Sequence, residues 1–207
     1  MTDDDLVARA LALDWLAATL RHARPLDDAM ATAPQGIATR DRAFAQLLAR
    51  SVLRRLGQID ALLARCLERP LPKGAWLARL ILRLGAVQLL FLDTPPHAAV
   101  DTAVGLAKQR AGRYQKLVNG VLRRLARDGA AWRDEQDAPR LNTPDWLWDS
   151  WSAAYGEDVT RAIAASHLSE PPLDFSAKPD RAVAFEATLL PTGSLRRPAG
   201  GRITDLP

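Results

Sequence analysis

The sequence lacks the residues from which most cofactor and metal sites are built. It has one cysteine, Cys66, which offers no internal disulfide, and its three histidines are too far apart for a close zinc-ligand motif. Its twelve glycines are scattered and never fall into the spacings that bind nucleotide phosphates. We therefore expect no catalytic residue, no metal site and no cofactor in this chain.

The sequence also lacks an uninterrupted hydrophobic run that would cross a membrane. Its longest apolar stretch, 75–92, is interrupted by Arg79 and Arg83, so we predict a buried core helix. The opening segment MTDDDLVARA is acidic and lacks the basic-then-apolar order of a secretory signal. These features predict a cytoplasmic protein without a membrane partner.

Charge is distributed unevenly along the chain, although the net charge is only +4. Residues 36–129 carry 17 basic and 6 acidic groups, whereas both flanking segments are acidic. A region this basic attracts phosphate backbones through counterion release, and arginine predominates among its basic groups. This distribution favours a nucleic-acid partner, with RNA preferred because guanidinium groups also stack on unpaired bases.

Apolar residues recur every three or four positions between residues 5 and 128, and no convincing alternation typical of strands occurs there. The pattern predicts an all-α bundle of successive helical hairpins. The expected helices are a first one ending near 22–25, a short one over 26–33, a long one from 39 to 66 that Gly57 kinks or breaks, the core helix, one after Pro96, and one over 113–127.

The helix over 113–127 has the most informative pattern, because its apolar and cationic residues fall on opposite sides. The apolar side predicts contact with a core, and the cationic side is either a nucleic-acid surface or a solvated face. Two sets of basic residues are our candidates for phosphate contacts. The first set, on this helix, is Arg113, Lys116, Arg123, Arg124 and Arg127; the second, as neighbours, is Arg50, Arg54, Lys108 and Arg110. Asn119 is either a further RNA contact or a structural residue beside Gly120.

Composition changes after Gly129. A polar segment reads as a linker, and Pro144 opens a helical pair over 145–155 and 157–167. Four tryptophans fall in or beside this part, and anchoring of the pair onto the bundle is favoured over base stacking. Beyond residue 170, LDFSAKP predicts a short strand and 181–190 a helix, which together resemble the opening of an α/β unit.

Three segments, RDRAFAQLLARSVLRRLGQIDALL, PPHAAVDTAVGLAK and KLVNGVLRRL, resemble in order the signature segments of the NusB-like RNA-binding domain. PDWLWDSWSAAYGED and PPLDFSAKPD are similar to the connector and first strand of the RsmB (Fmu, Sun) family of ribosomal RNA cytosine-5 methyltransferases. Free-standing NusB proteins usually have an acidic residue where Arg123 stands, which favours the methyltransferase branch.

The resemblance implies a NusB-like domain in 1–129, a linker in 130–143, a helical connector in 144–168 and the start of an incomplete α/β pre-catalytic subdomain in 169–207. It implies ribosomal RNA and the missing methyltransferase domain as partners. S-adenosylmethionine is implied for that missing domain alone, so this chain should position RNA without methylating it. Two alternatives stay open, a free-standing transcription antitermination factor and a helical protein-interaction module, and the sequence leaves the oligomeric state undetermined.

Overall fold

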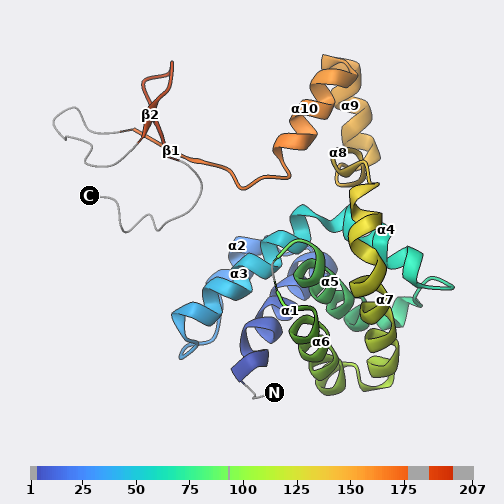
Figure 1. Ribbon diagram of the computed structural model, residues 1–207. Coiled ribbons are helices and arrows are strands. Elements are labelled where there is room, and N and C mark those ends of the chain that lie inside the picture. Colours follow the sequence, from blue (N-terminus) through green and yellow to red (C-terminus); the bar gives the residue numbers. More distant parts are fainter. Residues whose placement is uncertain (1–3, 93, 177–186, 198–207) are drawn as a thin grey trace.

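Short helices succeed one another along most of the chain in the computed structural model, which describes residues 4–92, 94–176 and 187–197 (Figure 1). The α-helices are α1 (Asp4–His22), α2 (Leu26–Ala31), α3 (Thr39–Arg54), α4 (Leu56–Cys66), α5 (Trp76–Leu90), α6 (Pro96–Arg110), α7 (Gln115–Asp134), α8 (Ala138–Leu141), α9 (Asp145–Tyr155) and α10 (Glu157–Ser166). Two 3₁₀ turns, η1 (Lys73–Ala75) and η2 (Gly112–Tyr114), precede α5 and α7. The predicted all-α bundle followed by a helical connector is confirmed.

Helix α5 forms the centre of the bundle and packs against α1, α3, α4, α6 and α7. Its side chains are buried along almost its whole length, which explains the long apolar run in the sequence. The two arginines in this run reach polar partners, because Arg79 donates to the Leu71 carbonyl and Arg83 forms a bidentate pair with Asp60. Within the described ranges, no helix is both long and apolar enough to cross a bilayer.

Glycines set the close approach of α5 and α7. A Cβ added at Gly85 would lie 2.5 Å from the Leu122 Cδ1 atom of α7, and one at Gly129 would lie 2.9 Å from Leu125 Cδ1 of its own helix and 3.2 Å from Leu90 Cδ2 of α5. Leu122 and Leu125 are fully buried, so these glycines make room for the side chains that hold α7 onto the core. The apolar side of α7 is therefore tightly fixed.

The predicted break at Gly57 is displaced by two residues. The chain leaves helical geometry at Arg55, with φ −112° and ψ 19°, and Gly57 lies inside α4. A Cβ at Gly57 would lie 1.7 Å from the Leu141 carbonyl oxygen, so the glycine is required by packing against the α8 segment. Sequence pattern alone suggested a kink or break at Gly57, whereas the structure shows a contact there between distant segments.

The segment predicted as a linker, 130–143, is partly helical. Helix α7 continues through Gly129 to Asp134, and α8 follows after a short turn. The predicted pair α9 and α10 is confirmed, with Gly156 at φ +80° between the two helices. We refer to α8, α9 and α10 together, residues 138–166, as the connector.

The C-terminal part forms a small antiparallel sheet of strands β1 (Leu173–Phe175), β2 (Thr188–Leu189) and β3 (Leu195–Arg197), in the order β1-β3-β2. The strand predicted in LDFSAKP is confirmed by β1. The helix predicted over 181–190 is wrong at its end, because residues 188–189 pair with β3 and a turn with Gly193 at φ +81° follows. Residues 181–186 of that prediction lie outside the described residues.

Candidate nucleic-acid interface

The two sides of α7 have opposite character, as predicted. Its apolar residues Val118, Val121, Leu122 and Leu125 are buried against α4, α5 and α6. At about 100° per residue, Lys116, Gly120, Arg123 and Arg127 fall along the opposite side, and all four are exposed. We call the three cations Lys116, Arg123 and Arg127 the basic face of α7.

The three cations of the basic face differ in whether they form an ion pair with a carboxylate of the protein. Among the described residues, no ion pair is found for Lys116 or Arg123, so their charges face solvent. Arg127 is 71% exposed, but its Nε and Nη2 atoms each donate to Asp128 at 2.9 Å. The hydrogen bond from Arg127 holds the pKa of the Asp128 carboxyl below its ordinary value, so this pair stays charged at neutral pH. Of the three, Lys116 and Arg123 are therefore the most available to pair with a phosphate.

Two further candidates on or beside α7 contact aromatic rings. The Arg113 guanidinium lies 4.7 Å from the centroid of the Tyr114 ring, and that of Arg124 lies 5.6 Å from the Trp132 ring. Both arginines remain exposed. Stacking of this kind holds the guanidinium plane without consuming its N–H donors on a carboxylate.

Near the turn between α6 and α7, Lys108, Arg110 and Arg113 extend the row of cations. Arg110 and Arg113 line a cavity of about 380 Å³ together with the first residues of α5. Lys108 is exposed, and Arg110 is partly neutralised because its Nη2 atom donates to Asp14 at 2.6 Å. This group lies directly before the basic face in the chain.

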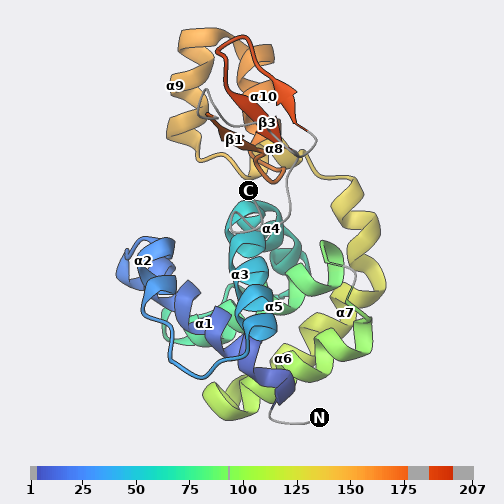
Figure 2. The same ribbon diagram turned by 90° about the vertical axis from the view of Figure 1, so that its left-hand side faces the viewer.

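The remaining two candidates lie on a different element. Arg50 and Arg54 belong to α3, and Figures 1 and 2 place α3 and α7 on opposite sides of α5. Arg50 lies 3.5 Å from an Asp27 oxygen, and Arg54 is half-buried. The structure thus brings together the candidates of α6 and α7 and leaves those of α3 apart.

Comparison with known proteins identifies the fold that carries this surface. The family model described as the NusB family matches residues 6–127, which is more than half of the chain. The chain belongs to the NusB family. Helices α1 to α6 and the cationic part of α7 lie within the match, and the connector and the sheet follow it.

Curated relatives of this NusB-family chain are considerably longer. Ribosomal RNA small subunit methyltransferase B of Thermus thermophilus is 42% identical over 155 residues, which are 72% of this chain and 36% of that protein. A protein of Salmonella paratyphi B with the same name is 30% identical over 167 residues, 79% of this chain and 39% of that protein. The chain thus matches between a third and two fifths of the length of these relatives.

The solved structure of T. maritima NusB shares the fold, with a TM-score of 0.53 and 24% identity. The superposition covers 65% of this chain and 99% of that one. A complete NusB structure therefore corresponds to about two thirds of the chain, which leaves the connector and sheet as additional elements.

The joint between the NusB bundle and the connector is made by polar groups that the sequence analysis missed. The Gln58 main-chain N–H donates to Asn142 Oδ1 at 3.1 Å, and Asn142 Nδ2 donates to Gln58 Oε1 at 3.0 Å. Gln58 Nε2 donates to Gln136 Oε1, and Gln136 Nε2 donates to the Gln58 carbonyl. We call these three side chains the Gln58 network; Gln58 itself is buried.

Arg55 forms a second set of hydrogen bonds where the NusB bundle meets the connector. Its guanidinium donates to Gln58 Oε1 at 3.0 Å and to the Leu168 carbonyl at 3.1 Å, and it lies 5.3 Å from the Phe91 ring centroid. Burial, together with the charges of Arg54 and Arg133, lowers the pKa of the Arg55 guanidinium. The only signal in the sequence was a polar residue, Gln58, beside the apolar stripe of its helix.

The tryptophans divide between anchoring and exposure. Trp132 packs against the NusB core and is flanked by Arg65 and Arg124. Trp148 is buried within the connector, where Arg140 and Arg161 lie 5.1 and 5.4 Å from its ring centroid. Trp146 is 71% exposed. Trp132 thus packs within the bundle and Trp148 within the connector, so neither shows the predicted anchoring of the helical pair onto the bundle.

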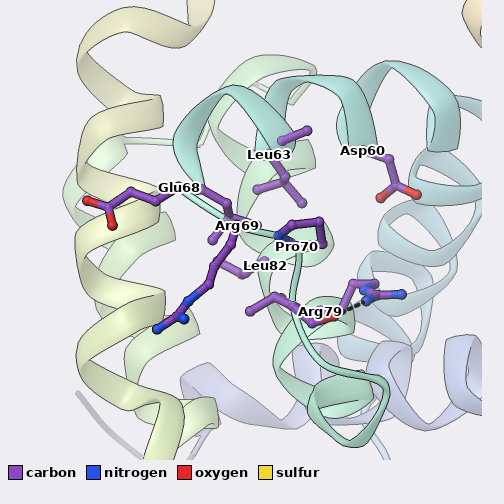
Figure 3. Close-up of a pocket in the computed structure, with 10 residues that line it drawn as sticks. Asp60, Leu63, Glu68, Arg69, Pro70, Arg79 and Leu82 are labelled. Carbon is purple, nitrogen blue, oxygen red and sulfur yellow. Dashed lines mark hydrogen bonds between the residues drawn. The ribbon is translucent and has the colours of Figure 1, made fainter.

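A second cavity, of about 290 Å³, lies between α4, the following loop and α5 (Figure 3). Leu63 and Leu82 supply apolar lining, and Arg79 and Asp60 are already bonded to Leu71 and Arg83. Figure 3 shows Glu68 and Arg69 extending outward, away from Asp60 and Arg79. The polar side chains of Asp60 and Arg79 therefore form hydrogen bonds within the bundle.

Cys66 does not fit the role of a nucleophile in methyl transfer to cytosine. Cys66 is buried on α4, and desolvation raises the pKa of its thiol, which disfavours the thiolate needed for nucleophilic attack. In the described ranges, no three His, Cys, Asp or Glu side chains gather as a metal-binding group. The basic face of α7 is therefore our candidate interface among the described residues.

Proposed function

We propose that this chain is the RNA-binding, substrate-positioning region of an S-adenosylmethionine-dependent cytosine-C5 methyltransferase of small-subunit ribosomal RNA. Family membership supports this reading for the NusB part of the chain, and the names of the long relatives support it for the whole protein to which that part belongs. For the parent protein we keep the predicted division into a NusB-like domain, 1–129, a linker, 130–143, a helical pair, 144–168, and the start of a subdomain, 169–207, in which α8 of the connector falls within the linker. The catalytic domain that binds S-adenosylmethionine is a separate part of the parent protein.

The observation that carries the proposal is the basic face on a firmly packed helix. Lys116 and Arg123 point to solvent from a helix whose opposite side is fixed by fully buried leucines. Cations on a rigid element bind phosphates at fixed positions, which a flexible basic tail would not do. Arg113, Arg124, Arg127, Lys108 and Arg110 flank this face and extend the phosphate-binding surface, and Arg50 and Arg54 provide a second surface on α3.

The test is binding of a structured fragment of small-subunit ribosomal RNA, measured by fluorescence anisotropy at several salt concentrations. The wild-type chain should bind with a strongly negative salt slope. Charge reversal in the double variant Arg123→Glu and Arg127→Glu should reduce the slope by about one per lost phosphate contact. Because both side chains are exposed, the fold should be retained.

Arg40→Glu is the matched control for the single reversal Arg123→Glu, since both change the net charge by two and Arg40 is also exposed but lies at the start of α3, away from α7. It changes net charge in the same direction and should leave most of the affinity intact. Equal losses in the control and the α7 variant would contradict a localised interface. Absence of salt-dependent RNA binding would refute the proposed function and favour a protein-interaction module with an acidic partner.

A further inference from the structure

Packing does not explain why position 120 in α7 is a glycine. It lies in the interior of α7, where glycine is less favourable than alanine because its backbone loses more freedom on folding. A Cβ added at Gly120 would meet nothing within 4 Å, and the residue is exposed. An alanine would fit here and stabilise the helix.

Three other helical glycines, Gly57, Gly85 and Gly129, have clear steric reasons. Added Cβ atoms there would lie 1.7, 2.5 and 2.9 Å from their nearest neighbours. Gly57 and Gly85 allow two segments of the chain to approach closely, and Gly129 makes room for a buried leucine of its own helix. At Gly120 the corresponding space is open to solvent, on the side of α7 that faces away from the core.

The open space lies in the middle of the basic face. A rise of about 1.5 Å per residue puts Lys116 and Arg123 about 10 Å apart along the axis, with Gly120 between them. A helical side chain covers the turn before its own Cα, so a glycine here leaves the main chain near Lys116 uncovered. The Lys116 carbonyl oxygen, which accepts the Gly120 N–H within the helix, keeps a second lone pair for an outside donor.

We infer that Gly120 is the point at which the RNA sugar–phosphate backbone approaches α7 most closely, an inference that rests on the proposed function. Lys116 and Arg123 bind phosphates on either side, and a ribose 2′-hydroxyl donates a hydrogen bond to the uncovered main chain. The 2′-hydroxyl distinguishes RNA from DNA, so this position contributes to the choice of nucleic acid. Gly120 is thus a specificity-determining position of the basic face.

The test compares Gly120→Ala and Gly120→Leu in the 207-residue chain. The probes are a structured fragment of small-subunit ribosomal RNA and a DNA oligonucleotide of the same sequence. Gly120→Ala should raise the Tm by about 3 °C, because the helix gains stability, and should weaken RNA binding about fivefold, the contribution of one hydrogen bond. Gly120→Leu should weaken it further, and DNA binding should change less than twofold for Gly120→Ala.

Ala126→Leu is the control, because Ala126 is exposed on the same helix about 120° around from Gly120. It should leave RNA affinity unchanged. If wild type binds RNA but both Gly120 variants bind equally well, the inference fails while the proposed function stands. Equal losses for RNA and DNA would also overturn it, and a wild type without salt-dependent RNA binding would refute the proposed function itself.

Discussion

Replacing Gly57 by alanine should loosen the connector from the NusB bundle. The new Cβ would lie 1.7 Å from the Leu141 carbonyl oxygen and 2.5 Å from its carbonyl carbon. Both are main-chain atoms, so no side-chain rotation can relieve the overlap. The α8 segment must move, and the hydrogen bonds of the Gln58 network must lengthen or break with it.

Two opposing contributions decide the size of the effect. Alanine in a helix interior is favoured over glycine by about 1 kcal/mol. Against this, overpacking costs about 1–3 kcal/mol, and each hydrogen bond lost at the joint adds about 1 kcal/mol. The Gln58 network contains four such bonds, so the net loss in connector docking is about 1–3 kcal/mol if one of them breaks and about 4–6 kcal/mol if all four do.

Amide hydrogen exchange measured by mass spectrometry separates this local effect from global unfolding. Exchange should accelerate tenfold or more in 138–166 and remain near wild-type rates in α5. Gly120→Ala is the matched control, because the same substitution in open space should stabilise the protein. Unchanged exchange in the connector, together with urea stability equal to or above wild type, would show that the Gly57–Leu141 contact does not hold the joint.

Three further predictions concern the connector and the core. Asp137→Asn removes a carboxylate whose pKa is held low by its hydrogen bonds from Arg161, so the stabilisation exists above the ordinary aspartate pKa and disappears as pH falls through the lowered value. Urea unfolding from pH 7 to pH 3 should show the variant less stable at pH 7 and the difference closing at the acid end. Cys66 should react with a thiol reagent at pH 8 far more slowly in folded than in urea-unfolded protein, and equal rates would contradict its burial and raised pKa. Leu122→Ala should cost about 2–5 kcal/mol in urea unfolding, because Leu122 is fully buried against Gly85, and a loss below 1 kcal/mol would indicate a loosely packed core.

Local periodicity predicted the bundle well because the burial of each helix is encoded in its own residues. The apolar run of α5 predicted a buried core helix, and the separation of charged from apolar residues on α7 predicted its core-facing side and its exposed cations. The connector helices were equally visible, since Pro144 and Gly156 mark their ends. Whether the exposed cations bind RNA stays a prediction.

The joint between bundle and connector escaped sequence analysis because its partners are far apart in the chain. Gln58 and Asn142 are separated by 84 residues, and Arg55 and Leu168 by 113. Polar side chains in such a joint have no periodicity. Gly57 was interpreted as a helix break, whereas its glycine is required by the close contact with Leu141 in the α8 segment. Strand β2 was mistaken for the end of a helix because two residues carry too little pattern to reveal pairing with β3.

On the proposed function, RNA binding belongs to the basic face of α7 and positioning belongs to the connector. Helix α7 is 20 residues long and carries its exposed cations in the first two thirds, whereas Arg133 near its end donates to the Leu90 carbonyl of α5. Gln136 and α8 then dock on α4, so the basic face and the connector are joined through one fixed helix. Small misplacements of a reacting group reduce rates steeply, so on the proposed function a rigid path from bound RNA through the connector favours accurate placement of a target base. On the proposed function, Gly57→Ala should therefore leave RNA affinity near wild type and lower methylation in the parent protein, whereas the Arg123 and Arg127 reversals should lower affinity first.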